Sequence, residues 1–512
     1  MFRYFFLGFI FSFNLVAVYA ADVNILDFGA HVDTVNNAQY IQKAIDHCAV
    51  TGGGYVYVPA GTFVSGTIFL QTNIHLRLHV HAVIQGSVHP ADYQKGGFIV
   101  AEDIENASII GDGTIDGRGY HQNFQLGDNS GSRAHLVYFI RCRNMVVKDV
   151  SLINSCMWTF RMAYCDEVRV QGINIYAHGN FNNDGIDIDS KNVLISDCRI
   201  DCDDDAICFK SDRPDFDVEH VVVTNCVLSS NCNAIKFGTA SNAGFRNISI
   251  SNCVIHKASE NNIRNWKGTI RGVAADTTVI SGIALEVVDG GFMDQVLISN
   301  ITMRDIQTPI FIRLGSRKTA GSLCNVVISG ITASNKSLLS SSITGIPGHD
   351  VENLTLRDII LYCTGGANAD DATRTVPENE KGYPENRMFG TTLPAYGLYV
   401  RHVRNLTIEN FQCFLLQPDS RPAFVFDNVH NLWLNNFQAS PPSGNFALIR
   451  LIESSDIYIS GFRAPQTTIP LFLQATGEQC TNISMVRNDF TRVTKAVDGN
   501  PLIKKRILVK DN

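Results

Sequence analysis

Short segments with alternating apolar and polar residues recur along most of the chain. Each segment has six positions, in the order polar, apolar, variable, apolar, variable and a closing residue. The closing residue is Asn, Asp or Gly in all but the last copy. Period-two alternation of β-branched residues is typical of short strands rather than amphipathic helices. The thirteen copies begin at Asn106, Asn144, Glu167, Asn192, His220, Asn247, Gln295, Asn325, Asn353, Asn405, Asn431, Asp456 and Asn482.

The spacing of these copies predicts a solenoid. From Asn144 onward most steps are 23–30 residues, and the two longer steps, of 48 and 52 residues, correspond to two turns with one weak copy or an insertion. A period of 20–50 residues is typical of repeat architectures. The fixed leucines and the helix per turn of a leucine-rich repeat are absent. We therefore predict an all-β protein, a single-stranded parallel β-helix in which each strand pairs with its counterpart one turn later.

The start of the solenoid needs a cap, because an open end would expose the core. Residues 37–50 place Ile41, Ala44, Ile45 and Cys48 on one helical face, just before the first expected strands at 54–58 and 66–70. We predict an amphipathic helix there that covers the N-terminal end of the core.

The repeats also set the domain organisation. A length of 512 residues predicts three or four domains at roughly 150 residues each, but stacked repeats form one elongated domain. We expect a β-helix over 21–495, with an N-terminal cap at about 21–88 and a C-terminal tail at 496–512. An inserted loop at about 365–392 is rich in Gly, Pro, Asp and Glu. We expect it to wall a binding groove, with Tyr383 in an aromatic rim.

Composition and charge exclude some classes of partner. The chain has 42 Lys and Arg against 49 Asp and Glu, a net charge of −7. This balance argues against non-specific nucleic-acid binding, which needs a basic face. Hydrophobic residues are 45% and charged residues 18% of the chain, which argues against disorder. We expect a monomer that binds neither nucleic acid nor membrane.

Residues 1–20 read as a secretory signal peptide. Arg3 precedes an apolar run that ends in a small-x-small pattern at Val18 and Ala20. The run is shorter than the ~20 residues that a membrane span needs. We expect a secreted protein, extracellular or periplasmic, after cleavage near Ala20.

The fourteen cysteines suggest disulfides in an exported chain. Cys198, Cys226 and Cys253, however, occupy equivalent positions six residues after the start of three repeats. We predict that these three form a buried ladder of thiols. The sequence has no zinc-binding pattern of Cys or His, and we expect no metal and no cofactor.

Acidic residues cluster in two neighbouring turns. Asp184 and Asp204 are 20 residues apart, close to one turn, so their segments should stack about 4.8 Å apart. Alternation directs Ile186 inward and Asp187 outward. Because like charges at this range cannot all stay ionised, at least one pKa should rise. A protonated acid beside a carboxylate base suits glycoside hydrolysis, and a calcium site is the alternative.

These segments resemble the polygalacturonase family of glycoside hydrolases (family 28), whose members are right-handed parallel β-helices, over about residues 24–482. Residues 182–185 look like the family's Asn-Thr-Asp-Gly element, and Asp204 with Asp205 looks like its paired aspartates. The resemblance implies that Asp204 is the general acid. It also implies that Asp184 and Asp205 activate a water molecule, with inversion at the anomeric carbon.

The chain departs from the family at two elements. Asn233 stands where the family's histidine should fall, and Ala284-Leu285-Glu286 stands where its Arg-Ile-Lys element should fall. In the family, that Arg and Lys grip a galacturonate carboxylate. Without a cation at those positions the charge-assisted pair cannot form there, which predicts weak activity on plain polygalacturonate.

Other side chains are candidates to replace that grip. Alternation directs Lys210 and Lys236 outward beside the aspartates, to contact substrate or to pair with Asp. Glu286 should also point outward, to bind a sugar hydroxyl or to remain an ordinary solvated carboxylate. Arg161 and Arg317 are further cations. The full set of substrate-binding candidates is Asn183, Asp187, Lys210, Asn233, Lys236, Glu286, Arg313 and His402.

The leading hypothesis is a secreted, inverting hydrolase of pectic poly- or oligosaccharides, acting on either homogalacturonan or rhamnogalacturonan. One alternative is a calcium-dependent polysaccharide lyase on the same solenoid. Another is a non-catalytic β-helix that binds carbohydrate.

Overall fold

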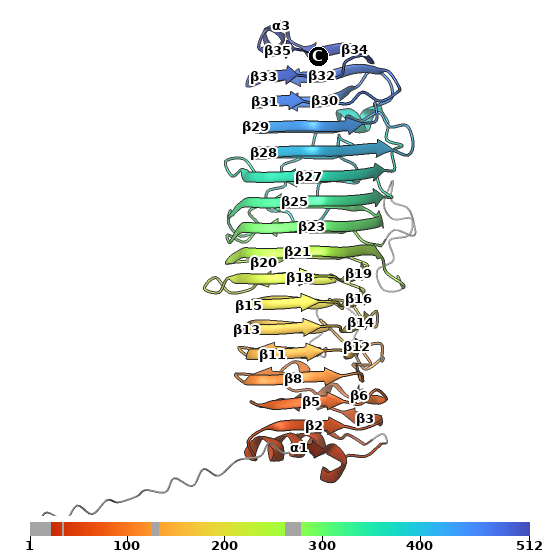
Figure 1. Cartoon of the computed structure of the whole chain (residues 1–512), viewed down its shortest axis with the longest axis vertical. Coiled ribbons are helices and arrows are strands. Elements are labelled where there is room, and N and C mark those ends of the chain that lie inside the picture. The colour runs from red at the N-terminus through yellow and green to blue at the C-terminus, as the bar shows by residue number, and fades with distance from the viewer. Residues whose placement is uncertain (1–21, 33–34, 125–132, 262–277, 512) are drawn as a thin grey trace, which may run out of the picture.

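The computed structural model describes residues 22–32, 35–124, 133–261 and 278–511. The expected signal peptide lies outside these residues. The described strands stack as rungs of one long column, and each pairs in parallel with a strand about one turn away (Figure 1). The parallel β-helix predicted from the repeats is therefore confirmed. None of the described helices is long and apolar enough to cross a membrane.

The polar ends of each repeat form the corners of the column. In strand β15 (Ile186–Ser196) the repeat begins at Asn192, with φ of 53°, and ends at Asp197, with φ of 60°. Asn and Asp tolerate this left-handed backbone better than other non-glycine residues. Side chains at equivalent corners also bond to each other, as where Asn405 Nδ2 donates to Asn353 Oδ1 at 2.9 Å.

The interior is a continuous apolar core with small side chains at some corners. The stacked rings of Phe209 and Phe237 lie 4.2 Å apart, centroid to centroid. Cys198, Cys226 and Cys253 are buried in line, as predicted for the thiol ladder. All fourteen cysteines of the chain are free thiols.

Both ends of the column are closed. Helix α1 (Ala38–Val50) lies across the N-terminal end and buries the four residues predicted for its inner face (Figure 1). The second expected strand shortens to β4 (Ile68–Phe69), because the backbone of Gly66 bonds to Asn36. At the other end, helix α3 (Pro501–Lys504) leads into strand β35 (Ile507–Lys510). Strand β35 pairs with β33 (Thr481–Val486), so residues expected as a tail add a further rung.

Four consecutive turns carry the candidate site. Strand β15 pairs with β17 (Ile207–Ser211), β17 with β20 (Asn233–Ser241), and β20 with β22 (Ser281–Val287). The register aligns Ile186, Ile207, Ile235 and Ile283 in the core. The next residue along each strand is directed away from this core, and in β20 that residue is Lys236, which lines the cavity described below.

Candidate active site

Asp184, Asp204 and Asp205 converge on one cavity of about 510 Å³. Its wall also includes Asn233 and the two lysines that were expected to point outward, Lys210 and Lys236. The stacking predicted from the 20-residue spacing therefore brings the three aspartates together.

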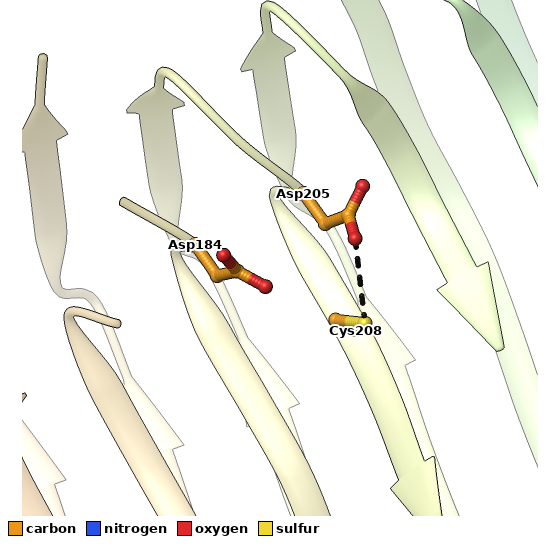
Figure 2. Close-up of side chains that lie close together, drawn as sticks. All are labelled: Asp184, Asp205 and Cys208. Carbon is orange, nitrogen blue, oxygen red and sulfur yellow. Dashed lines mark hydrogen bonds between the residues drawn. The ribbon is translucent and has the colours of Figure 1, made fainter. Parts of the chain in front are cut away.

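Backbone hydrogen bonds fix the relative positions of the two acidic segments. Gly185 N donates to Asp205 O at 2.8 Å, and Ile186 N donates to Ala206 O at 3.0 Å. Figure 2 shows Asp184 and Asp205 extending from adjacent segments that lead into β15 and β17. One carboxylate oxygen of Asp184 and one of Asp205 lie within 4.8 Å of each other. The two carboxyl groups are therefore close neighbours in the cavity.

Asp205 is held as a carboxylate by the groups around it. Burial raises its pKa, but Lys236 and Lys210 and the hydrogen bond from Asn233 outweigh burial and hold it well below the usual range. Lys236 Nζ lies 3.1 Å from Asp205 Oδ2. The backbone N and the side-chain Nδ2 of Asn233 donate to Asp205 Oδ1 at 3.1 and 2.8 Å. Asn233 thus bonds directly to the Asp205 carboxylate.

Asp184 has the opposite electrostatic setting. Burial, followed by the nearby charges of Asp187 and Asp204, raises its pKa well above the ordinary value, although Lys210 opposes the shift. Lys210 Nζ lies 3.5 Å from Asp184 Oδ2. The expectation that at least one carboxyl group of the cluster would have a raised pKa is thus met by Asp184.

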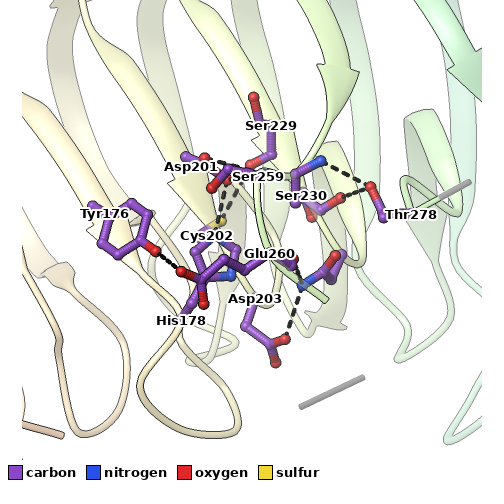
Figure 3. Close-up of polar contacts among 12 residues, drawn as sticks. Tyr176, His178, Asp201, Cys202, Asp203, Ser229, Ser230, Ser259, Glu260 and Thr278 are labelled. Carbon is purple, nitrogen blue, oxygen red and sulfur yellow. Dashed lines mark hydrogen bonds and ion pairs between the residues drawn. The ribbon is translucent and has the colours of Figure 1, made fainter. Parts of the chain in front are cut away.

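Asp204 sits on a turn that is held from behind. Its Oδ1 accepts a hydrogen bond from Asp205 N at 3.0 Å. Its backbone oxygen accepts from Ser230 Oγ at 2.5 Å and from Cys202 Sγ at 3.2 Å. Thr278 Oγ1 in turn donates to Ser230 O at 2.9 Å (Figure 3). This support fixes the peptide that carries the expected general acid.

A second layer of polar contacts braces the same turns. His178 Nε2 lies 2.8 Å from Asp201 Oδ1, and Tyr176 bonds to Glu260 (Figure 3). Asn231 Nδ2 donates both to Asp203 Oδ1 at 3.1 Å and to the backbone oxygen of Glu260 at 2.8 Å. The sequence pattern did not reveal this layer, because its members come from three turns and a loop.

Three of the expected substrate-binding residues have structural roles instead. Asn183 is completely buried, and its Nδ2 donates to Ser155 O at 2.9 Å, so it fixes the turn while its neighbour Asn182 lines the cavity. Arg313 is buried and donates to the backbone oxygen of Gly345 and to the backbone oxygens of residues 378 and 379, in the middle of the inserted loop. His402 bonds to Asn428 and Glu378.

Asp187 is also not at the cavity wall. It is buried beneath it, 3.6 Å from Lys210 Nζ, and burial raises its pKa to about 7. Asp187 thus pairs with the lysine and does not line the cavity itself. The same strand carries Asp189, buried as well and with a pKa raised by burial to about 7.

Glu286 is not the solvated carboxylate that we weighed for it. It points outward from β22 but is only 1% exposed, because the neighbouring strand and the inserted loop cover it. Burial raises its pKa to about 7. It packs against Gly238, where a Cβ atom would lie 3.2 Å from the Cβ of Glu286.

The inserted loop forms one wall of the cavity, as expected. It contains helix α2 (Ala369–Thr373), and Tyr383, Pro384 and Glu385 line the cavity. Thr239 Oγ1 donates to Tyr383 Oη at 3.1 Å, and Asn386 Nδ2 donates to Ile280 O at 2.7 Å. These contacts join segments far apart in the sequence.

The cluster is poorly suited to calcium. Among the described residues, two clusters of three side chains bring possible ligand atoms within 4.8 Å of one another. Each cluster includes a buried thiol, Cys208 in one and Cys232 in the other. Calcium takes six to eight oxygen ligands, whereas Lys210 and Lys236 already pair with these carboxylates.

A model of the family "Glycosyl hydrolases family 28" matches residues 48–377, which is more than half of the chain. The fold and the cavity define a parallel β-helix with an acidic site on its side. The chain belongs to glycosyl hydrolase family 28.

Curated relatives are similar at low identity. A probable polygalacturonase of Vitis vinifera is 29% identical over 227 residues, 39% of this chain and 46% of the relative. A probable polygalacturonase of Arabidopsis thaliana is 26% identical over 323 residues, 60% of this chain and 64% of the relative. Rhamnogalacturonase A of Emericella nidulans is 29% identical over 194 residues, 37% of this chain and 36% of the relative. The chain thus spans less than two thirds of each relative's length.

Solved structures share the fold. An exopolygalacturonase from Thermotoga maritima has a TM-score of 0.60 at 21% identity, over 77% of this chain and 91% of that chain. The surface adhesin PfbA of Streptococcus pneumoniae has a TM-score of 0.54 at 16% identity, over 78% of this chain and 93% of that chain. At such identities the likeness shows the β-helix fold alone.

Proposed function

We propose that the protein hydrolyses glycosidic bonds of pectic poly- or oligosaccharides with inversion at the anomeric carbon. The convergence of Asp184, Asp204 and Asp205 on one cavity of a family 28 β-helix carries this proposal. The names of the relatives, polygalacturonases and rhamnogalacturonases, support a pectic substrate.

We propose the role that the family resemblance implies for each aspartate. Asp204 donates a proton to the leaving glycosidic oxygen. Asp184 and Asp205, with oxygens within 4.8 Å, hold the attacking water between them. Asp205 stays ionised beside Lys236, so it accepts the proton of this water as the oxygen attacks the anomeric carbon. Attack from the face opposite the leaving group inverts the configuration.

The test is product analysis with defined homogalacturonan and rhamnogalacturonan oligosaccharides. Mass spectrometry should show the addition of one water per bond cleaved, and proton NMR should show the inverted anomer first. An unsaturated, ultraviolet-absorbing product whose formation stops with a chelator would identify a lyase instead. No cleavage of any pectic substrate would favour a non-catalytic carbohydrate-binding protein and would overturn the proposal.

We further propose that the protein is secreted, on the basis of residues 1–20 alone. Expression in a secreting host and N-terminal sequencing of the exported protein should find Ala21 first. Retention in the cell with Met1 intact would contradict this.

A further inference from the structure

The C-terminal end of the column is cationic, although the protein as a whole is acidic. Residues 487–511 contain seven Lys and Arg against three Asp, a net charge of +4 in a chain of −7, so the rest of the chain carries −11. The N-terminal end differs, because residues 22–60 contain four Asp and one Lys. Charge is therefore segregated along the column, and the C-terminal end attracts anions from solution.

The last turn gathers these cations on one surface. Figure 1 shows α3, β34 (Val493–Gly499) and β35 together at the C-terminal end of the column. Lys495 of β34 and Lys504 of α3 both approach Asp498, with their Nζ atoms 2.7 and 3.7 Å from its Oδ1. The seven cations are all exposed: Arg487, Arg492, Lys495, Lys504, Lys505, Arg506 and Lys510.

The acidic side chains of this segment neutralise only part of the charge. Lys495 and Lys504 share one aspartate, and Lys510 lies 3.9 Å from its neighbour Asp511. Lys505 has no ion pair with any residue that the structure describes. These pairs are open to solvent, since the side chain of Lys504 is 42% exposed and that of Asp498 is 39% exposed. Exposed pairs of this kind are weak, so an added anion can compete for the cations.

A pocket of about 550 Å³ lies within the same surface. Asn500, Leu502 and Arg506 line it, together with Glu478 of the preceding turn. Arg506 is held there, because its Nη1 donates to the backbone oxygen of Glu478 at 2.9 Å. The lining combines an apolar side chain with amide, carboxylate and guanidinium groups, which suits a sugar ring that carries both hydroxyl groups and an acid.

The exposed apolar residues at this end do not form a membrane-binding face. Leu508 and Val509 are consecutive residues of β35, so their side chains point to opposite faces of the strand. Binding at a bilayer surface requires one continuous apolar face. A second copy of the protein is also disfavoured, because it would bring like charges together. The surface therefore fits a flexible polyanionic chain.

This surface is separate from the catalytic cavity. Seven strand pairings lead from β22 to β34, so at about 4.8 Å per turn the two lie roughly 34 Å apart along the column. A long polysaccharide can occupy both places at once, whereas a short oligosaccharide cannot. Binding at the end of the column would raise the effective concentration of the same chain at the cavity.

We propose that the cationic C-terminal end is a second, non-catalytic binding site for de-esterified stretches of a pectic chain. This inference rests on the proposed function, which brings that polymer to the protein. Each uronate of such a stretch carries a carboxylate, so several weak, exposed contacts act together along one chain. A methyl-esterified stretch carries no charge and would not be held there.

Calorimetry with long polygalacturonate and its fully methyl-esterified form tests the site, using protein that carries Asp204→Asn to prevent cleavage. Replacing Lys504, Lys505 and Lys510 together by Gln should weaken binding of polygalacturonate by at least about fivefold at low ionic strength, and about 0.5 M salt should abolish the difference. The matched control replaces three exposed lysines elsewhere on the column, Lys43, Lys148 and Lys257, by Gln. It removes the same charge and should change the affinity by less than about twofold.

Unchanged affinity in the C-terminal triple variant would overturn the site, as would equal weakening in both triple variants, which would show an effect of net charge alone. Tighter binding to phosphatidylglycerol vesicles or to single-stranded nucleic acid than to polygalacturonate would identify another ligand and would also overturn it. If the C-terminal triple variant does not fold by circular dichroism, Lys505→Glu decides, and unchanged affinity would refute the site. Binding that depends on these lysines, without hydrolysis by the wild-type protein, would refute the proposed function alone.

Discussion

Two of the aspartates at the cavity, Asp184 and Asp205, have opposite pKa shifts because their neighbours differ. Asp205 has Lys236 and Asn233 within hydrogen-bonding range, and its pKa is depressed. Asp184 is buried near other carboxylates, and its pKa is raised. The two carboxyl groups of Asp184 and Asp205 therefore have pKa values shifted in opposite directions, although they lie in the same cavity.

Asp204→Asn and Asp205→Asn should each lower hydrolysis by about 10²–10⁴-fold, since each removes one proton-transfer group. Both amides preserve the shape of the side chain, so thermal unfolding should stay within a few degrees. The measurement is the rate of reducing-end release, with circular dichroism as the stability check. Asp189→Asn is the matched control, because Asp189 is a buried aspartate of β15 that does not itself line the cavity. Parent-like rates in both catalytic variants would refute the assignment.

Asp189 should make the protein less stable as pH rises. Burial raises its pKa to about 7 in the folded state, against about 3.9 when unfolded. Between these values the unfolded chain loses the proton and the folded chain keeps it. The free energy of unfolding therefore falls by about 1.4 kcal/mol per pH unit from this group.

Asp189→Asn should remove this part of the slope in denaturant titrations run from pH 4 to 7. Asp197→Asn serves as control, because Asp197 is exposed and its pKa is lowered, so its contribution changes only below this range. An identical slope in the wild type and in Asp189→Asn would show that Asp189 ionises normally.

For single residues, the sequence predicted which way a side chain points better than it predicted which groups the side chain contacts. Period-two alternation placed Lys210 and Lys236 correctly beside the aspartates. It could not show that Asn183 turns inward to Ser155 while Asn182 faces the cavity. It also could not show that Arg313 would bond to the middle of the inserted loop, because that depends on how a distant segment folds back.

At the scale of elements, the repeated unit is a strand with a left-handed corner at each end. The first and last residues of the repeat that begins at Asn405 have φ of 58° and, at Asn410, 53°. Asn405 also links two neighbours, donating to Asn353 and accepting from Asn431, each at 2.9 Å. The polar positions that read as strand boundaries are therefore bends that keep successive turns in register.

Asn405→Ala should destabilise the protein by about 2–3 kcal/mol. The left-handed backbone costs a residue with a Cβ about 1–2 kcal/mol, and the lost hydrogen bonds add about 1 kcal/mol. Asn405→Gly separates the two terms, because glycine adopts this backbone freely and loses only the bonds and chain stiffness. Denaturant unfolding measures both variants. Equal stability of the alanine variant and the wild type would contradict the role of the corner.

Elements with regular patterns were predictable and irregular ones were not. The four inward residues of α1 and the strand of each repeat follow from apolar spacing. Helix α2 has five residues and is held by a capping box at Asn368 rather than by an apolar stripe. Strand β35 was missed because it has no repeat consensus, although it pairs with β33.

The whole molecule is a column in which each turn contacts mainly its neighbours, as in other solenoids. The cavity forms where four turns carry outward polar residues and one long loop folds back across them. The contact between Thr239 and Tyr383 joins residues 144 positions apart. The long column thus has an extended surface, and the inserted loop bounds that surface at the cavity.

The same architecture protects the thiols. Cys198, Cys226 and Cys253 each donate to the carbonyl oxygen two residues earlier, at 3.2, 3.3 and 3.3 Å. All of the cysteines except Cys324 are buried.

Iodoacetamide should therefore label at most Cys324 in the native protein and all fourteen in denaturant, even without a reductant, as counted by mass spectrometry. A reductant should leave Tm unchanged, since no bridge is present to break. Fewer labelled sites in unreduced, denatured protein would reveal disulfides. Native labelling of Cys226, at the centre of the ladder, would mean that the turns separate more readily than their continuous pairing implies.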